Sequence, residues 1–149
     1  MRLNGIHHIS AITGDALRNV DFYTRVMGMR LIAKTVNQDD PGAYHRFYGD
    51  EHARPGFDMT FFEYPGAMPG HAGAGAPHRI SWRVGSPDSL DFWERRLRDQ
   101  AQEVERHGDE LWFRDPEGLG HALVVYDGPG APLAAGHADI PAEHALRGF

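Results

Sequence analysis

Apolar positions recur along this chain in two periods, which predict the same succession of elements twice. An alternating segment typical of a strand opens each half, at residues 5–12 and again at 78–84. A helical spacing with one apolar face follows, from Leu17 to Met27 and from Leu90 to Leu97. Three more strands are predicted after each helix, at 29–36, 43–48 and 59–64 in the first half and at 103–106, 111–114 and 121–126 in the second. Each half is therefore predicted to be a βαβββ unit.

Capping residues and a direct alignment of the two halves support this repeat. Asp15 precedes the first helix and Gly28 follows it, while Ser86 and Pro87 form a favourable N-cap and first turn for the second. HHIS at 7–10 aligns with HRIS at 78–81, and VDFY aligns with LDFW.

The predicted fold is α+β, with two tandem βαβββ units that form a curved mixed sheet. The divisions are a first unit at 1–65, a Gly/Pro-rich linker at 66–77, a second unit at 78–127 and a tail at 128–149. One four-stranded sheet with one helix leaves an apolar face open, so the units are expected to share a core. The concave surface between them is the natural place for a site.

Composition narrows the function classes. With 149 residues, 41% of them hydrophobic and 24% charged, the chain resembles an ordinary globular domain. A net charge of -6 without a basic run argues against nucleic acid or an anionic membrane as partner and favours a small molecule. The absence of Cys excludes disulfides and thiolate sites, and no long apolar segment marks a signal peptide or membrane helix. We therefore expect a cytoplasmic protein.

His8 is the best candidate for chemistry. Strand alternation places His8 and Ser10 on one face of the first strand and His7 on the other, so the adjacent His residues are not expected to share a face. An imidazole aimed from a central strand into a concavity is a good ligand for Fe(II), Mn(II) or Zn(II). A hydrogen-bonded, half-buried His is the commoner outcome for such a residue. Both interpretations stay open on spacing alone.

Four further residues are weaker candidates. Arg79 takes the place of His8 in the second half, where it binds either an anionic substrate group or an ordinary surface ion partner. Glu63 shares parity with Met59 and Phe61, so it either faces the site or ends its strand in solvent. His45 either lines the cavity or belongs to a hydrogen-bond network. His121 is the one obvious ligand on the last strand of the second half, and the other His residues fall in loops or tail, where solvated surface is the default.

Several segments resemble the glyoxalase/bleomycin-resistance/extradiol-dioxygenase superfamily, also called vicinal oxygen chelate proteins. FRDPEG at 113–118 resembles the superfamily's F-x-D-P-[DE]-G turn before the last strand of a unit. GIHHISAITGD, KTVNQDDPGAYHRFYGD and PGFDMTFFEYPG resemble the N-terminal half of two-domain ring-cleaving dioxygenases of the hydroquinone and chlorohydroquinone type.

That resemblance implies an extradiol-type dioxygenase that uses O2 to open hydroquinone- or catechol-like rings. It implies His8 as a metal ligand, with Fe(II) ahead of Mn(II) and Zn(II), and His7 as a second-sphere, proton-handling residue. In that family the other two ligands, a His and a Glu, come from a fourth βαβββ unit. The final segment IPAEHALRGF is accordingly expected to lead into a C-terminal half of the same protein.

Two alternatives remain beside this hypothesis. One is a metal-free binding or structural domain, whose cup is filled by the aromatic residues Phe61, Phe62, Tyr64, Trp82 and Trp112. The other is a glyoxalase-like isomerase with a metal site shared across a homodimer, for which exposed strand edges supply a surface. The isomerase needs inward carboxylates on the fourth strands, where Glu63 is a candidate and Ala122, at the acidic position of many family members, argues against it.

Overall fold

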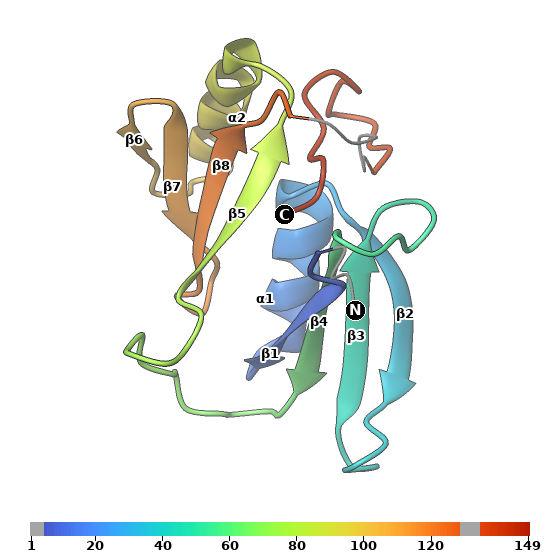
Figure 1. Cartoon of the computed structure of the whole chain (residues 1–149). Helices are drawn as coiled ribbons and strands as arrows, with labels where there is room; N and C mark the ends of the chain where they lie inside the picture. Colours follow the sequence, from blue (N-terminus) through green and yellow to red (C-terminus); the bar gives the residue numbers. More distant parts are fainter. Residues whose placement is uncertain (1–4, 129–134) are drawn as a thin grey trace.

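The computed structural model describes residues 5–128 and 135–149 and contains two βαβββ units (Figure 1). The first unit consists of β1 (His8–Thr13), α1 (Ala16–Asp21) with its π-helical extension η1 (Phe22–Val26), β2 (Arg30–Val36), β3 (Tyr44–Gly49) and β4 (Asp58–Glu63). The second consists of β5 (Arg79–Val84), α2 (Pro87–Asp99), β6 (Glu105–His107), β7 (Glu110–Arg114) and β8 (Gly120–Val125). The predicted α+β class and the order of the elements are confirmed. Neither helix among the described residues has the length and apolar content needed to cross a membrane.

Each unit forms its own four-stranded mixed sheet. The strand orders are β1-β4-β3-β2 and β5-β8-β7-β6, with the pairs β1/β4 and β5/β8 parallel and the other pairs antiparallel. We call the sheet face that packs against the helices the inner face, and the opposite one the outer face. Apolar side chains of η1 and of both inner faces pack together between the units, so the expected shared core is confirmed.

The predicted helix ends are confirmed. The Asp15 side chain accepts the backbone N–H of Arg18 at 3.1 Å, and the Ser86 hydroxyl accepts that of Ser89 at 3.3 Å. Gly28 follows η1 with φ of 71°. A Cβ there would also lie 2.3 Å from Ile140 Cδ1, so glycine is required for both conformation and space.

A chain of buried hydrogen bonds joins the two units. Trp82 Nε1–H donates to His121 Nδ1 at 3.0 Å. Because an indole N–H is only a donor, Nδ1 must be the bare ring nitrogen, and His121 carries its proton on Nε2. This Nε2–H therefore donates to the Tyr23 hydroxyl at 3.1 Å, and that hydroxyl donates to Asp115 Oδ2 at 3.1 Å. All four residues are at most 6% exposed, so the chain crosses the common core.

The FRDPEG turn between β7 and β8 fastens the second unit to the first. Asp115 Oδ1 accepts the backbone N–H groups of Glu117 and Leu119 at 2.9 and 2.8 Å, which closes the turn. Glu117 reaches across with its side chain and accepts the Gly14 N–H at 2.7 Å. Asp50 plays the equivalent role in the first unit, where its Oδ1 accepts the N–H groups two and four residues ahead. The FRDPEG segment thus stabilises its own turn and also connects the second unit to the first.

The last segment, 135–149, packs more closely than the sequence indicated. His144, assigned to solvated surface by its position in the tail, is half-buried and stacks on Phe92 with ring centroids 4.7 Å apart. Its carbonyl accepts Trp93 Nε1–H at 2.7 Å. The backbone at 147–148 pairs with Arg83 on the free edge of β5, at 2.9 and 2.8 Å. The surface assignment of His144 was wrong. Its position in the tail does not reveal that a helix face and a strand edge far away in the sequence are open to pack against this segment.

We expect the Tyr23→Phe substitution to destabilise the fold by about 3 kcal/mol, because it leaves buried polar atoms of His121 and Asp115 without partners. Urea denaturation followed by circular dichroism measures the loss. Tyr44→Phe is the matched control, since Tyr44 is 45% exposed, and it should change stability by no more than about 0.5 kcal/mol. Equal effects of the two substitutions would contradict a structural role for the buried hydrogen-bond chain.

Candidate functional site

The outer face of the first sheet gathers most of the residues singled out from the sequence. In the parallel pair β1/β4, His8 lies opposite Asp58 and Ser10 lies opposite Thr60. The Ser10 and Thr60 hydroxyls form a hydrogen bond at 2.9 Å. On β3, His45 lies opposite Phe62 and joins the same face. The outer face thus carries two imidazoles, those of His8 and His45. Beside them lie the Asp58 carboxylate and the hydrogen-bonded hydroxyl pair.

His7 and His8 are in direct contact, which the sequence did not predict. Alternation of faces would have separated them, but β1 begins only at His8, and the His7 ring turns to meet its neighbour edge-on at 5.3 Å between centroids. Their Nδ1 atoms lie 3.2 Å apart. One Nδ1 must carry the proton and the other must accept it. If His8 is the donor, its Nε2 is bare and exposed, which is the form in which imidazole binds a metal.

Two polar atoms on this face are buried without a hydrogen-bond partner among the described residues, His45 Nε2 and Asp58 Oδ1. His45 is packed between Phe47 and Phe62, with centroids 4.1 and 4.0 Å away. Burial lowers the pKa of His45, and the nearby charge of His8 lowers it further. Unsatisfied buried polar groups in a native fold call for an unseen partner. Both residues belong to the same outer face as His8.

Asp58 is a site residue that sequence reasoning missed. Burial raises the pKa of its carboxyl, and the charge of His7 opposes that rise. The space for this carboxylate comes from Gly49, where a Cβ would lie only 2.8 Å from Asp58 Oδ1. The available signal was its parity with Thr60 and Phe62, hidden because the predicted strand began one residue later.

The face holds fewer metal ligands than a complete site needs. Within residues 5–128 and 135–149, no three His, Cys, Asp or Glu side chains come together to hold an ion. His8 is exposed and can supply one ligand. The donor set therefore fits a metal only as a partial contribution, with further ligands from outside these residues.

Glu63 and Arg79 are not brought to His8. Glu63 shares the inner face with Phe61, as its parity required, but that face turned out to be the packed one. Its carboxylate pairs with Arg46, with Oε2 2.8 Å from Nη2. Arg79 lies on the outer face of the second sheet, with its guanidinium 3.4 Å from the centre of the Trp112 ring.

His121 is part of the core rather than an open ligand. It is 0% exposed, and both ring nitrogens are engaged, by Trp82 and by Tyr23. Burial lowers the pKa of His121 to about 3. The sequence offered it as a ligand because alternation does not tell which face of a strand is packed.

The aromatic residues considered as the filling of one cup do not share a surface. Phe61 and Trp82 are buried on the inner faces, at 1% and 0% exposure. Phe62 and Trp112 lie on the two outer faces, in separate sheets. The aromatic content therefore builds the common core and two separate surfaces.

Comparisons with known proteins identify the family and the fold. The model of the Glyoxalase/Bleomycin resistance protein/Dioxygenase superfamily matches residues 5–121. The Bacillus subtilis (strain 168) protein named "Putative ring-cleaving dioxygenase MhqA" is 43% identical over 157 residues, covering 100% of this chain and 49% of its own length. The chlorohydroquinone/hydroquinone 1,2-dioxygenase of Sphingobium indicum is 33% identical, covering 99% of this chain and 48% of its own.

A solved structure has the same fold as this chain. A crystal structure described as a "putative dioxygenase" from Bacillus subtilis subsp. subtilis str. 168 superposes with a TM-score of 0.88 at 38% sequence identity. It covers 97% of this chain and 47% of its own. The chain thus spans about half the length of the relatives it matches.

We expect His121 to remain neutral, with its proton on Nε2, down to about pH 4, because burial holds its pKa near 3. In the unfolded chain the imidazole has its ordinary pKa of 6.5. The unfolded chain therefore binds the extra proton first, and this residue removes up to about 1.4 kcal/mol of stability per pH unit as the pH falls from 6.5 toward 3.

Long-range ¹⁵N–¹H spectra of histidine-labelled protein report the tautomer directly. A protonated Nδ1, or a titration of His121 near pH 6.5, would show that the assigned hydrogen-bond direction is wrong. Trp82→Phe is the control, because it removes the donor that fixes the tautomer.

Proposed function

The chain belongs to the Glyoxalase/Bleomycin resistance protein/Dioxygenase superfamily, and we propose on this basis that it forms the N-terminal half of a metal-dependent dioxygenase that opens hydroquinone- or catechol-like rings with O2. The observation that carries the proposal is the exposed His8 imidazole on the outer face of the first sheet, with His7 Nδ1 3.2 Å from its own Nδ1. One relative, which matches 100% of the chain at 43% identity, is named a putative ring-cleaving dioxygenase, and another, which matches 99% at 33% identity, is named a chlorohydroquinone/hydroquinone 1,2-dioxygenase.

His8 is the metal ligand in this proposal. Its Nε2 would bind Fe(II), with Mn(II) or Zn(II) as other possible occupants, and the remaining positions would be filled by ligands from a C-terminal half of the same protein. A ferrous ion with open positions supplies one centre to which a ring oxygen and O2 can both bind. Because the described residues offer no three-ligand group, the outer face acts as one wall of the site.

His7 orients His8 and handles a proton. When His8 Nδ1–H donates to His7 Nδ1, the ring of His8 is held with Nε2 outward, and His7 carries its own proton on Nε2. From that atom His7 can exchange a proton with a substrate hydroxyl. Metal-binding imidazoles commonly donate their second N–H to such an acceptor.

The rest of the outer face would receive the aromatic substrate. Phe62 and Phe47 flank His45 and exclude water from its surroundings. The Ser10 hydroxyl would bind a ring oxygen, and the buried His45 would form part of the surface beneath the substrate. Glu63 and Arg79 have no part in this site, because each lies on a different face.

The isomerase alternative is less well supported. It requires carboxylates directed into the site from the fourth strands of both units. Asp58 is such a carboxylate on β4, but Glu63 is engaged with Arg46 on the inner face, and the outer positions of β8 include Gly120 and Ala122 rather than an acidic residue. A homodimer is still compatible with the free strand edges, but it would not by itself supply the missing carboxylate.

The proposal is tested in a protein that carries this chain together with the further βαβββ units, loaded anaerobically with Fe(II). We expect hydroquinone to trigger O2 uptake, and His8→Ala to lower the uptake at least about 100-fold with loss of bound iron. Parallel assays with catechol decide between the two substrate classes.

His52→Ala is the matched control, since His52 is exposed in the turn after β3 and only its backbone N–H is hydrogen-bonded. It should retain both iron and activity. Stoichiometric iron that survives His8→Ala would remove His8 from the site. Iron that depends on His8 without O2 uptake on either substrate would overturn ring cleavage and leave the metal site standing.

A further inference from the structure

The outer face of the second sheet contains a cleft that the proposed dioxygenase site does not use. Its volume is about 450 Å³, within the range of about 300–1,000 Å³ typical of small-molecule sites. Arg79 lies opposite Gly120, and Gly120 lies opposite Arg114, so the three residues form one row across β5, β8 and β7. Strand spacing puts the two arginine Cα atoms about 10 Å apart.

Gly120 keeps the middle of this row empty. A Cβ at that position would lie 2.6 Å from the carbonyl oxygen of His78, so no other residue fits without moving backbone. The row therefore has a gap between the two arginines, where no side chain projects from β8. A group of the size of a carboxylate is suited to that gap.

Arg79 is held in place but is not neutralised. Its guanidinium lies over Trp112 at 3.4 Å from the ring centre, an arrangement that orients the group while leaving its N–H edge free. Among the residues that the structure describes, it forms no ion pair. Arg114 uses one nitrogen to donate to the Gly118 carbonyl at 2.9 Å, and its other donors remain available.

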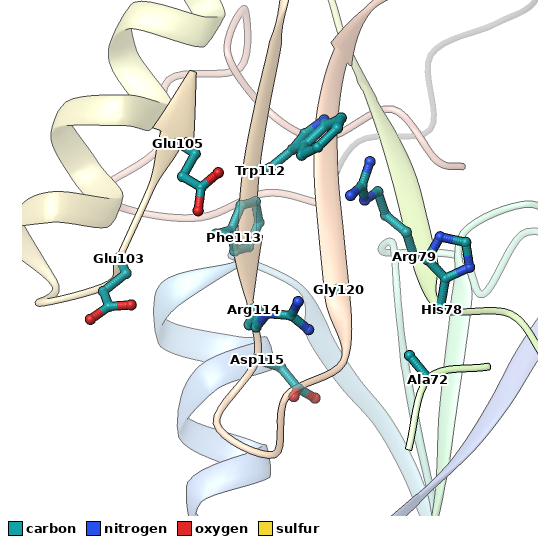
Figure 2. Close-up of a pocket in the computed structure, with 10 residues that line it drawn as sticks. All are labelled: Ala72, His78, Arg79, Glu103, Glu105, Trp112, Phe113, Arg114, Asp115 and Gly120. Carbon is teal, nitrogen blue, oxygen red and sulfur yellow. The ribbon is translucent and has the colours of Figure 1, made fainter. Parts of the chain in front are cut away.

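The acidic residues of the cleft are Glu103, Glu105 and Asp115. In Figure 2, Arg79 and Trp112 lie on one side of the strand that carries Arg114, whereas Glu103 and Glu105 lie on its other side. Glu105 Oε2 is hydrogen-bonded to His107 at 3.0 Å. The Asp115 carboxylate accepts the hydrogen bonds of Tyr23 and of its own turn. Within the described residues, neither arginine is paired with a carboxylate of the cleft, so both guanidinium groups are available to an anion.

Corresponding positions of the two units carry different side chains on their outer faces. Arg79 and Gly120 occupy the positions that His8 and Asp58 occupy in the first unit, as the pairings of β5 with β8 and of β1 with β4 show. An imidazole beside a carboxylate suits a cation, whereas two arginines beside a glycine repel one. We propose that this cleft, bordered by Arg79, Arg114 and Trp112, is a second binding site that takes a small organic carboxylate. It requires no metal at His8 and stands independently of ring cleavage.

The test is a titration of the metal-free, ¹⁵N-labelled chain with sodium benzoate at constant ionic strength, followed by two-dimensional NMR. We expect saturable shifts of the Gly120 amide and the Trp112 indole N–H. Arg79→Gln should weaken binding by about tenfold or more, because it removes a charge-assisted pair of hydrogen bonds. Arg79→Lys should restore only part of the affinity, since a lysine keeps the charge without the planar donor edge.

Arg83→Gln is the matched control. Arg83 also lies on β5 and the same outer face, with its guanidinium 4.5 Å from the centre of the Tyr126 ring and outside the cleft. It should leave benzoate binding unchanged. Shifts that do not saturate, that chloride reproduces, or that fall equally in the Arg79 and Arg83 variants would overturn the site. The same spectra show whether each variant is folded.

Discussion

The rest of the structure depends on one buried hydroxyl, that of Tyr23. It must accept a hydrogen bond from His121 and donate one to Asp115, and both partners belong to the other unit. Burial raises the pKa of the Tyr23 phenol, and the Asp115 carboxylate raises it further, so the group stays a donor. Four buried polar residues would be costly if any partner were missing. They are compatible with a common core because Trp82, a donor only, fixes the direction of the whole chain.

This constraint decides which surfaces are left for ligands. Since η1 and the inner faces are joined through Tyr23, both outer faces are turned away from the shared core. The repeat then places corresponding residues on two open surfaces, where substitutions do not disturb packing. One surface acquired His8 with Asp58, and the other acquired Arg79 with Gly120. The repeated unit thus presents two outer faces with different side chains at corresponding positions, and the two proposed sites rest on that difference.

Much of the fold was predictable because period and caps are local properties. The order of elements, the start of α2 at Ser86 and the end of the first helix at Gly28 all follow from short segments. The family resemblance also pointed to His8. The packing of residues 135–149 was not predictable, since it depends on a strand edge and a helix face far away in the sequence.

The candidate site was harder to predict, for a physical reason. Alternation along a strand gives two sets of residues but does not identify the packed one. Glu63 and His121 were therefore offered as site residues although both belong to inner faces. The contact between His7 and His8 was excluded by the same rule, which fails where a strand begins. Asp58 was overlooked because a shift of one residue in the start of β4 hid its place on the outer face.

The central claim is that the outer face of the first sheet holds a metal through His8, with the other ligands supplied from outside this chain. Anomalous diffraction at the iron edge, from crystals of the Fe(II)-loaded protein that contains the further units, tests it most directly. We expect an iron peak within bonding distance of His8 Nε2, with His7 Nδ1 still in contact with His8 Nδ1 and two more ligands from the other half. An iron peak elsewhere, with His8 unliganded, would contradict it.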